Sequence, residues 1–314
     1  MVESLEKMDL GKLKTYSLNR RKSKVNLQLF ARSLHKGASF KEFYASLPKV
    51  LAAENLHKVS AAVVNSAKAK KMVIFMAGAH VLKCGLNPIV INLIKRGVIK
   101  CVVLNGAGII HDFELAYAGF TSEDVSEAIK DGSFGMAKET AEFINTAIKE
   151  GNDCGLGLGK SVAEAIDKHN LPHRNLSLLY NCLKYKIPVC VQVAIGTDII
   201  HQHPSCDGAA VGEASLRDFH QLIAQVAKLE KGVLLNFGSA VILPEVFLKA
   251  LTVARNLGYK VKDFTTANFD MLFHYRPQQN IVCRPTQGTG KGYYILGHHE
   301  IMLPLLAAAV IEKL

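Results

Sequence analysis

The most constraining feature of the chain is a repeated unit. It consists of a short, almost wholly apolar segment, a glycine-bearing turn, and a segment whose apolar residues have helical spacing. Segments apolar at nearly every position must be covered on both faces of a sheet. The sequence therefore predicts an α/β fold: a Rossmann-like, doubly wound, mostly parallel six-stranded sheet with helices on both faces. The predicted strands are 71–77, 99–105, 187–195, 231–237, 260–267 and 292–297.

Helical periodicity lies between several of these strands. The predicted helices are 87–97, 177–186, 216–231 and 244–258. The segment KEFYASLPKVLAAENLHKVSAAVVNSA, before the first strand, also has a helical pattern. We therefore predict two parts, an N-terminal helical extension over 1–65 and the sheet domain over 66–314.

Composition limits the class of protein. Of the 314 residues, 49% are hydrophobic and 21% are charged, and no apolar run approaches the roughly 18 residues that a membrane span requires. The N-terminus is too charged for a signal peptide, so we expect a cytoplasmic protein without a membrane partner. The seven cysteines are scattered and form no CxxC pair, which predicts reduced thiols and no disulfide framework.

The formal net charge is +11, a value that would suit a nucleic-acid partner. The basic residues are spread thinly, however, apart from RRKSK at 20–24 and KAKK at 68–71. No helix-turn-helix, zinc finger or basic-aromatic pattern accompanies them. We therefore expect no nucleic-acid partner, and attribute the charge to a solvated basic surface.

Glycine turns follow four of the predicted strands: MAGAH at 76–80, NGAGIIHD at 105–112, AIGTDIIHQH at 194–203 and NFGSAV at 236–241. In a parallel sheet these turns converge on one edge, where backbone amides can approach a diphosphate. Asp112 and Glu114 are placed to meet a ribose. The alternative is that the glycines only provide positive φ for tight turns. GLGLGKS at 155–161 is not expected to bind phosphate, because Cys154 replaces the first glycine of that motif.

Histidines form three groups along the chain. His111 is next to Asp112; His201 and His203 precede Cys206; and His298 and His299 precede Glu300. These side chains include zinc ligands, but their spacing matches no HExxH-like pattern. Acid-base work by a histidine beside a carboxylate is the favoured interpretation, because the carboxylate orients the ring and raises its pKa.

The order of the motifs resembles the deoxyhypusine synthase family from about Phe75 to the C-terminus. The matching segments are MAGAHVLKCGL, NGAGIIHDFEL, LLYNCLKYKIPVCVQVAIGTDII, LLNFGSAVILPEVFLKALTVARNLG, TTANFD, YRP and YYILGHHEIMLPLLAA. The family consists of tetrameric enzymes with an NAD-binding Rossmann-like fold. They transfer the aminobutyl group of spermidine to a lysine of a translation factor. The resemblance implies an NAD cofactor here.

The resemblance also implies which residues bind the cofactor. They lie in the glycine turns and at the family's threonine–alanine pair. Carried onto this sequence, they are Gly78, Ala79, His80, Gly106, Ala107, Gly108, Asp112, Gly238, Ser239, Thr266 and Ala267. Asp112 falls on the acidic residue that meets the ribose.

The chain departs from the family at its chemistry. Pro285 stands at the position of the imine-forming lysine, and Arg284 cannot replace that lysine because a guanidinium forms no imine. Gln278 and Gln279 replace an acidic pair of the amine pocket. Lys291, in the loop GTGKG, could take the vacated place. Otherwise His111 or His201 would serve as a base, and the catalytic candidates are Lys291, His111, Asp198 and His201.

The sequence thus predicts a deoxyhypusine synthase-like, NAD-dependent transferase or redox-assisted enzyme. Its substrate would be a small, polyamine-like amine, and authentic deoxyhypusine synthase activity is not expected. We expect a homotetramer with sites at subunit interfaces. Two alternatives remain open: a catalytically silent NAD-binding or regulatory subunit, and a metal-assisted hydrolase that uses His201 and His203.

Overall fold

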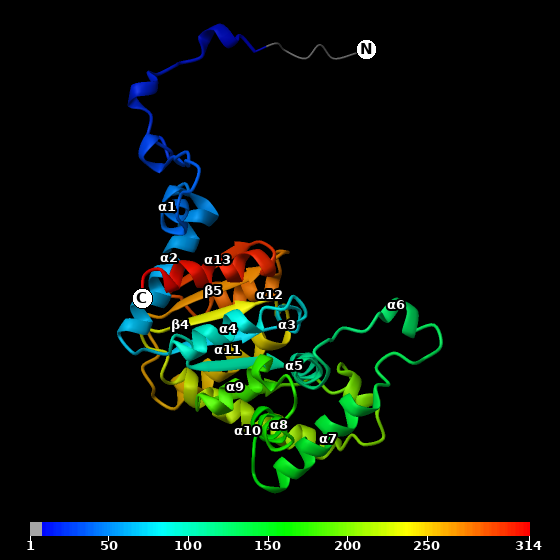
Figure 1. Ribbon diagram of the computed structural model, residues 1–314. Helices are drawn as coiled ribbons and strands as arrows, with labels where there is room; N and C mark the ends of the chain where they lie inside the picture. Colours follow the sequence, from blue (N-terminus) through cyan, green and yellow to red (C-terminus); the bar gives the residue numbers. More distant parts are fainter. Residues whose placement is uncertain (1–7) are drawn as a thin grey trace, which may run out of the picture.

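The computed structural model describes residues 8–314, which form one sheet with helices on both faces and an N-terminal segment that runs away from it (Figure 1). All strand pairs are parallel, in the order β3-β2-β1-β4-β5-β6. This confirms the predicted doubly wound fold. The strands are β1 (Val73–Ala77), β2 (Cys101–Asn105), β3 (Val189–Gln192), β4 (Val233–Phe237), β5 (Thr265–Asp270) and β6 (Lys291–Leu296).

Five of the six strands lie inside their predicted ranges or within one residue of them. The exception is β5, predicted at 260–267 and found at Thr265–Asp270. Lys260, Lys262 and Asp263 before it are exposed and charged, and Asp263 has a positive φ of 56°. Its end was missed because Asn268 and Asp270 are polar, yet both are buried. Asn268 is accommodated because its side-chain oxygen accepts a 2.6 Å hydrogen bond from Asn236 on β4.

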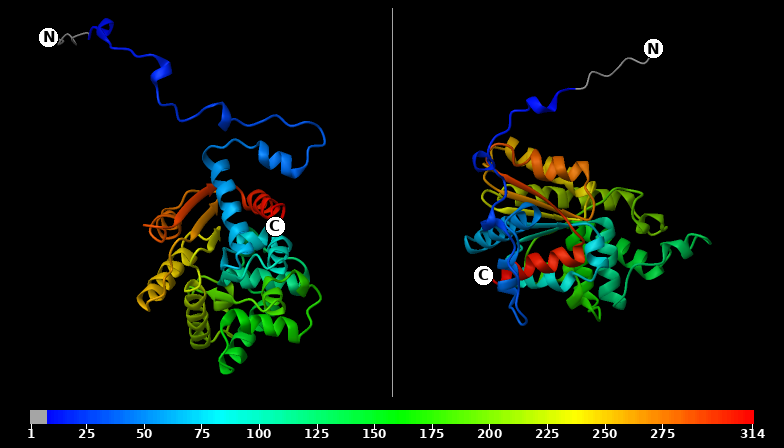
Figure 2. Two further views of the ribbon diagram at one scale, coloured as in Figure 1. Left: turned by 90° about the vertical axis from the view of Figure 1, so that its left-hand side faces the viewer. Right: turned by 90° about the horizontal axis from the view of Figure 1, so that it is seen from above.

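Helices cover both faces of the sheet (Figure 2). One face is covered by α2 (Leu51–Lys68), α4 (Asn87–Lys95), α5 (Gly106–Ala118) and α13 (His299–Ile311). The other is covered by α11 (Ile242–Asn256) and the second half of α10 (Gly208–Val226). The remaining helices are α1 (Phe40–Ser46), α3 (His80–Lys83), α6 (Val125–Ala128), α7 (Lys138–Asp153), α8 (Leu158–Lys168), α9 (Leu178–Lys184) and α12 (Tyr275–Pro277).

The topological switch point lies between β1 and β4. These neighbouring strands connect onward in opposite directions, β1 through α3 and α4 and β4 through α11. Because α4 and α11 cover opposite faces, the chain leaves β1 and β4 toward opposite sides of the sheet, the arrangement that forms a crevice in open parallel sheets. Ligands of open parallel sheets bind at such a crevice.

The edge strand β3 is protected by side chains of α10. Asp218 accepts a hydrogen bond from the Val191 amide at 2.8 Å, and Ser215 donates to the Val191 carbonyl at 3.1 Å. These bonds satisfy backbone groups that no further strand pairs with. Among residues 8–314 no helix has the length and apolar character needed to cross a membrane.

The N-terminal part is helical only from Phe40 onward. Residues 8–39 contain short 3-10 turns and have mostly exposed side chains. The predicted helical extension is therefore wrong for this stretch, which has no continuous apolar face. α2 packs on the sheet and α13 through the buried Leu56, Val59 and Val63, so its last turn crosses the predicted boundary at residue 65.

Candidate functional site

The turns after β1 and β4 meet at the switch point. A Cβ on Gly78 would lie 2.5 Å from the Gly238 carbonyl oxygen, so this position requires glycine. Gly238 has a φ of +67°, and a Cβ there would lie 2.5 Å from Nε2 of His299. These two glycines thus allow the turns and the first residue of α13 to pack closely. The predicted cofactor residues Gly78, Ala79 and His80 lie on one turn, and Gly238 and Ser239 on the other.

Two histidines lie next to these turns. His299 is 2% exposed, packs 6.0 Å from the Phe237 ring, and lies 5.9 Å from the His80 ring. Burial lowers the pKa of His299, although the nearby Asp270 carboxylate opposes the shift. Its Nδ1 has no hydrogen-bond partner among the described residues. A neutral, buried imidazole beside the switch point can accept a proton at neutral pH.

Carboxylates and a thiol complete this group. Asp270 ends β5 and lies 3.8 Å from His274. Glu300 lies 4.0 Å from the Cys84 thiol, which is itself 3.4 Å from Nε2 of His80. Burial raises the pKa of that thiol, so its sulfur is protonated at neutral pH. We call His80, Cys84, Asp270, His299 and Glu300 the switch-point cluster.

The first turn of α11 has amides open to a ligand. The Val241 side chain does not cap the helix; the Leu243 amide donates to the Ser239 hydroxyl and the Glu245 amide to the Val241 carbonyl, both at 3.3 Å. The amides of Ala240, Val241 and Ile242 have no partner within the part of the chain that the structure describes. Uncapped amides and the positive end of the helix dipole favour an anion at this turn.

The second predicted cofactor turn is filled by the protein itself. The Asp198 carboxylate faces the Ala107 amide at the start of α5, and this amide opposes the rise in the Asp198 pKa that burial causes. A Cβ on Gly106 would lie only 1.9 Å from Asp198 Oδ2, which explains this glycine. Asn105 also caps the helix by accepting from Gly108 at 3.1 Å. A diphosphate at this turn would meet a carboxylate, so the structure does not support a cofactor role for Gly106, Ala107 and Gly108.

Asp112 is not at the sheet edge. It is fully buried and accepts hydrogen bonds from the Ser177 hydroxyl (2.5 Å) and the amides of Leu178 (2.6 Å) and Leu179 (3.1 Å) at the start of α9, and from Asn87 (3.2 Å). Burial raises its pKa to about 6 against the effect of these hydrogen bonds. The ribose role predicted for Asp112 is therefore wrong, because no ligand can reach its carboxylate.

A third buried aspartate caps α8. Asp218 accepts from the Gly159 amide at 2.8 Å, and burial raises its pKa to about 7. A Cβ on Gly157 would lie 1.9 Å from Asp218 Oδ1. Gly157 of GLGLGKS thus makes room for an internal carboxylate, to which Gly159 donates its amide. Asp112, Asp198 and Asp218 together place an acid at the start of three helices, and we call them the internal acids.

The predicted pairing of His111 with Asp112 is wrong, because the two side chains leave α5 on different sides. Nδ1 of His111 is 2.6 Å from the Thr121 hydroxyl, which donates to Glu114. Burial alone would raise the pKa of Glu114, but hydrogen bonds from His111, Thr121 and Thr140 lower it overall. His111 is therefore oriented through Thr121 by Glu114, which also is not free to meet a ribose.

Three other predicted residues lie away from the carboxyl edge. Lys291 is the first residue of β6 and pairs with Thr265, so it lies at the amino edge of the sheet. It cannot replace the missing nucleophile at the switch point. Thr266 and Ala267 are fully buried inside β5, and the Thr266 hydroxyl bonds to the Ile281 carbonyl at 2.7 Å. A cofactor role for these two residues is contradicted by their burial.

Asp198 and His201 share the turn after β3. Nδ1 of His201 accepts hydrogen bonds from the amides of Gly196 at 3.2 Å and Asp198 at 3.3 Å. Burial raises the pKa of Asp198 to about 6 and lowers that of His201. His201 thus has backbone partners at Nδ1, whereas its Nε2 and Asp198 Oδ2 have no hydrogen-bond partner among the described residues. Within residues 8–314, no group of three or more His, Cys, Asp or Glu side chains is placed to hold a metal ion, including His201, His203 and Cys206.

Sequence reasoning missed Asp270 and gave His299 no role. Asp270 ends a strand that is buried almost throughout, a position from which a side chain reaches the carboxyl edge. His299 follows β6 by three residues at the same edge. The signal in both cases was position relative to a strand end, the end of β5 for Asp270 and the end of β6 for His299.

No family model and no curated protein matches the chain. Several solved structures share its fold. A protein assigned as a deoxyhypusine synthase from Entamoeba histolytica is 11% identical, with a TM-score of 0.54 over 90% of this chain and 96% of that one. The cyanobacterial arginine dihydrolase ArgZ of the ornithine-ammonia cycle is 14% identical, with a TM-score of 0.52 over 84% of this chain.

A third structure is AgrE in complex with ornithine and NAD+, which is 15% identical with a TM-score of 0.53 over 82% of this chain. This chain spans about a third of the ArgZ and AgrE chains, 33% of each. At these identities the likeness establishes the Rossmann-like fold alone.

Proposed function

We propose that the protein binds a nicotinamide dinucleotide at the switch point, with the diphosphate on the first turn of α11. The observation that supports this most is the contrast among helix starts. α5, α8 and α9 each begin on an internal acid, whereas α11 begins with uncapped amides beside two glycine turns. Gly238, Ser239 and Ala240 would approach the diphosphate, and Gly78 and Ala79 would border it.

The reaction we propose is redox-assisted chemistry on a small amine. When bound, the nicotinamide would supply hydride acceptance. His299, neutral because of its burial, would take the proton that the substrate releases. The Asp270 and Glu300 carboxylates would hold an ammonium group. Two carboxylates suit a small amine better than a long polyamine.

Authentic deoxyhypusine synthase activity is not part of this proposal. Pro285 offers no amine, and Lys291 lies at the other end of the sheet. Lys83, which follows the switch-point turn on α3, has an exposed side chain and forms no ion pair within residues 8–314. The chemistry we propose therefore requires no covalent imine with the protein.

A homotetramer with sites at subunit interfaces is also proposed. Large apolar side chains are exposed around the carboxyl edge, near the switch-point cluster. They are Ile195, Val241, Met271, Leu272, Phe273, Tyr275, Leu296 and Ile301, each at least 44% exposed. Exposed apolar groups that surround a polar site favour burial by a second copy. Sedimentation of Leu272→Asp with Phe273→Asp tests this, because a smaller species than the parent is expected.

The test of the proposed function is calorimetric titration of the full chain with NAD+ and NADH. We expect one site per chain, and hydride transfer to NAD+ with some member of a panel of small amines and amino acids. Binding without turnover across the panel would favour the silent NAD-binding subunit. The absence of binding of either nucleotide would remove both proposals.

A further inference from the structure

A row of lysines lies along the amino edge of the sheet, opposite the proposed site. Each strand has one at its first residue or within three residues before it. In sheet order they are Lys186, Lys100, Lys71, Lys231, Lys262 and Lys291. Neighbouring strands are about 4.8 Å apart, so the row spans about 24 Å. We call it the lysine row.

Backbone hydrogen bonds fix neighbouring members of the lysine row in register. The Lys231 amide donates to the Lys262 carbonyl at 3.1 Å, and the Lys100 amide donates to Val73 at the start of β1 at 3.0 Å. The Lys291 amide donates to Phe264, just before β5, at 3.1 Å. The spacing of the charges is therefore set by the sheet.

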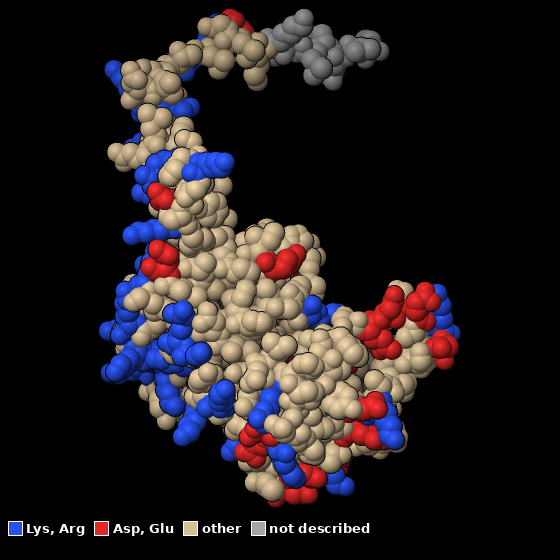
Figure 3. Space-filling view, in the orientation of Figure 1, with Lys and Arg blue, Asp and Glu red and all other residues tan. Residues whose placement is uncertain are grey.

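The surrounding loops add cations and few acids. These loops and the helix ends that lead into them also carry Lys68, Lys70, Lys95, Arg96, Lys184, Lys228, Arg255, Lys260 and Arg284. Only Glu230 and Asp263 are acidic in the same loops. None of these basic side chains forms an ion pair within residues 8–314, although lysines next to α6 and on α8 and α11 do. Figure 3 shows the blue side chains gathered on one side of the molecule, away from the acidic protrusion around α6.

Three lysines of this edge adopt a backbone conformation that is unusual for them. Lys70, Lys186 and Lys231 have positive φ values of 54°, 55° and 58° where α2, α9 and α10 lead into strands. Glycine is the ordinary residue at such a helix end, and this chain uses Gly97 and Gly258 at two equivalent places. The helix dipole favours a cation near a helix C-terminus. It does not explain why a lysine, and not a glycine, adopts the positive φ at these three positions.

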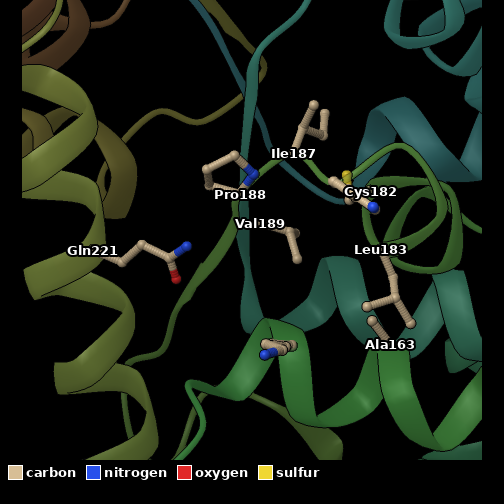
Figure 4. Close-up of a pocket in the computed structure, with 9 residues that line it drawn as sticks. Ala163, Cys182, Leu183, Ile187, Pro188, Val189 and Gln221 are labelled. Atoms are coloured by element: carbon tan, nitrogen blue, oxygen red, sulfur yellow. The ribbon is translucent and has the colours of Figure 1, made fainter.

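A cavity adjoins the β3 end of the lysine row. It has a volume of about 300 Å³ and is lined by apolar atoms of Leu183, Ile187 and Pro188 and by the lysines Lys160 and Lys186. Gln221 extends toward it from α10 (Figure 4). Its apolar walls and one amide suit a planar base with polar edges, and its lysines suit the adjoining phosphates.

We propose that the amino edge binds single-stranded nucleic acid. The lysine row would neutralise successive phosphates, and the cavity would receive a base near one end of the bound strand. An acidic polypeptide has the charge for the row but no group that suits the cavity. The lysines that the sequence spreads thinly are brought together by the parallel topology, since each precedes a different strand. This removes the ground for expecting no nucleic-acid partner.

Fluorescence anisotropy of the full chain with a labelled 20-nucleotide, mixed-sequence single-stranded RNA tests the proposal. We expect a Kd on the order of 1 to 10 µM at 50 mM KCl, weakening with salt by about 0.7 in log-log slope per phosphate contact. Lys231→Gln with Lys262→Gln should weaken binding about tenfold and reduce the slope by about 1.4. The matched control, Lys138→Gln with Lys149→Gln on α7, changes net charge equally and should leave affinity within twofold.

Three outcomes would overturn the proposal. The first is the absence of salt-dependent binding. The second is an equal loss from the α7 control pair, or a larger loss from Arg20→Gln with Arg21→Gln in the other basic run. The third is displacement of the RNA by a polyglutamate of the same charge as effectively as by unlabelled RNA. Unchanged thermal midpoints would show that every variant is folded.

Discussion

The two halves of the sheet differ in what lies against the backbone amides at the starts of their helices. In the β2/β3 half, α5, α8 and α9 begin on Asp198, Asp218 and Asp112, whose carboxylates take the backbone amides. In the β1/β4 half, the amides of Ala240, Val241 and Ile242 at the start of α11 have no partner within residues 8–314, and they lie next to His299 and two glycine turns. The same local geometry is thus closed by the protein in one half and open to a ligand in the other.

This difference shows that a glycine turn at a helix start can accommodate either a side chain of the protein or a ligand. In NGAGIIHD the glycine accommodates an acid from a distant turn, Asp198, and the acid within the motif, Asp112, caps a different helix. In NFGSAV the glycine accommodates a histidine and donates its own amide to Phe269, while the amides of Ala240 and Val241 have no partner within residues 8–314. A motif of this kind therefore predicts an anion at a helix start, but not whether that anion is a ligand or a side chain.

The strongest way to break this comparison is to remove an internal acid. Asp112→Ala should lower the free energy of unfolding by about 3 to 5 kcal/mol, because it leaves four buried donors without an acceptor. Chemical denaturation measures this change. Asp112→Asn keeps part of the hydrogen bonding and should cost less. A native-like stability of Asp112→Ala combined with loss of NADH binding would restore the ribose role.

The pH dependence of stability tests whether Asp218 is buried as an internal acid. Its pKa of about 7 in the folded protein is above its unfolded value near 4, so the folded state binds the proton more tightly. The stability that this group contributes is present below pH 4 and is lost as pH rises to about 7. The change is up to about 4 kcal/mol. Asp218→Asn should remove that part of the pH dependence in denaturation curves, and an unchanged slope would contradict the assignment.

Asp198 should have a smaller effect. Asp198→Ala removes one helix cap and should lower the free energy of unfolding by about 1 kcal/mol. Because the proposed diphosphate site is on α11, the NADH affinity of the variant should stay within about twofold of the parent. Calorimetry on the folded variant checks this, and a loss of binding would place the nucleotide on α5.

His299 should give the smallest effect, with the opposite sign to Asp218. Burial lowers its pKa in the folded state, so it contributes stability above its unfolded pKa near 6.5, and this is lost as pH falls through the lowered value. His299→Gln should therefore reduce the acid-side loss of stability slightly. A loss that is unchanged, measured between pH 7 and pH 5, would argue against a buried neutral imidazole.

Much of the fold follows from the sequence, because uniformly apolar strands and amphipathic helices alternate regularly. The place of Lys291 at the amino edge of the sheet could also be predicted from the sequence. A residue that opens a strand lies at the amino edge of a parallel sheet, and Lys291 directly precedes GYYILG. The prediction that Lys291 takes the place of the family's imine-forming lysine does not agree with this rule.

The role of Asp112 could not be predicted in the same way. Its partners, Ser177, Leu178 and Leu179, lie some 65 residues later, and nothing local specifies that contact. Asp198 likewise reaches Ala107 only because β2 and β3 are neighbours. The sequence predicted acids and glycines in the right turns, while strand order decided which of them meet.

The central claim is tested most directly by placing an acid on α11 like those of the β2/β3 half. Ala240→Asp should reduce NADH affinity at least about a hundredfold, because the carboxylate would take the free amides and repel the diphosphate. The neutral Ala240→Asn should lose less, and Asp198→Ala should keep parental affinity in the same titration. Undiminished NADH binding by folded Ala240→Asp would contradict the account.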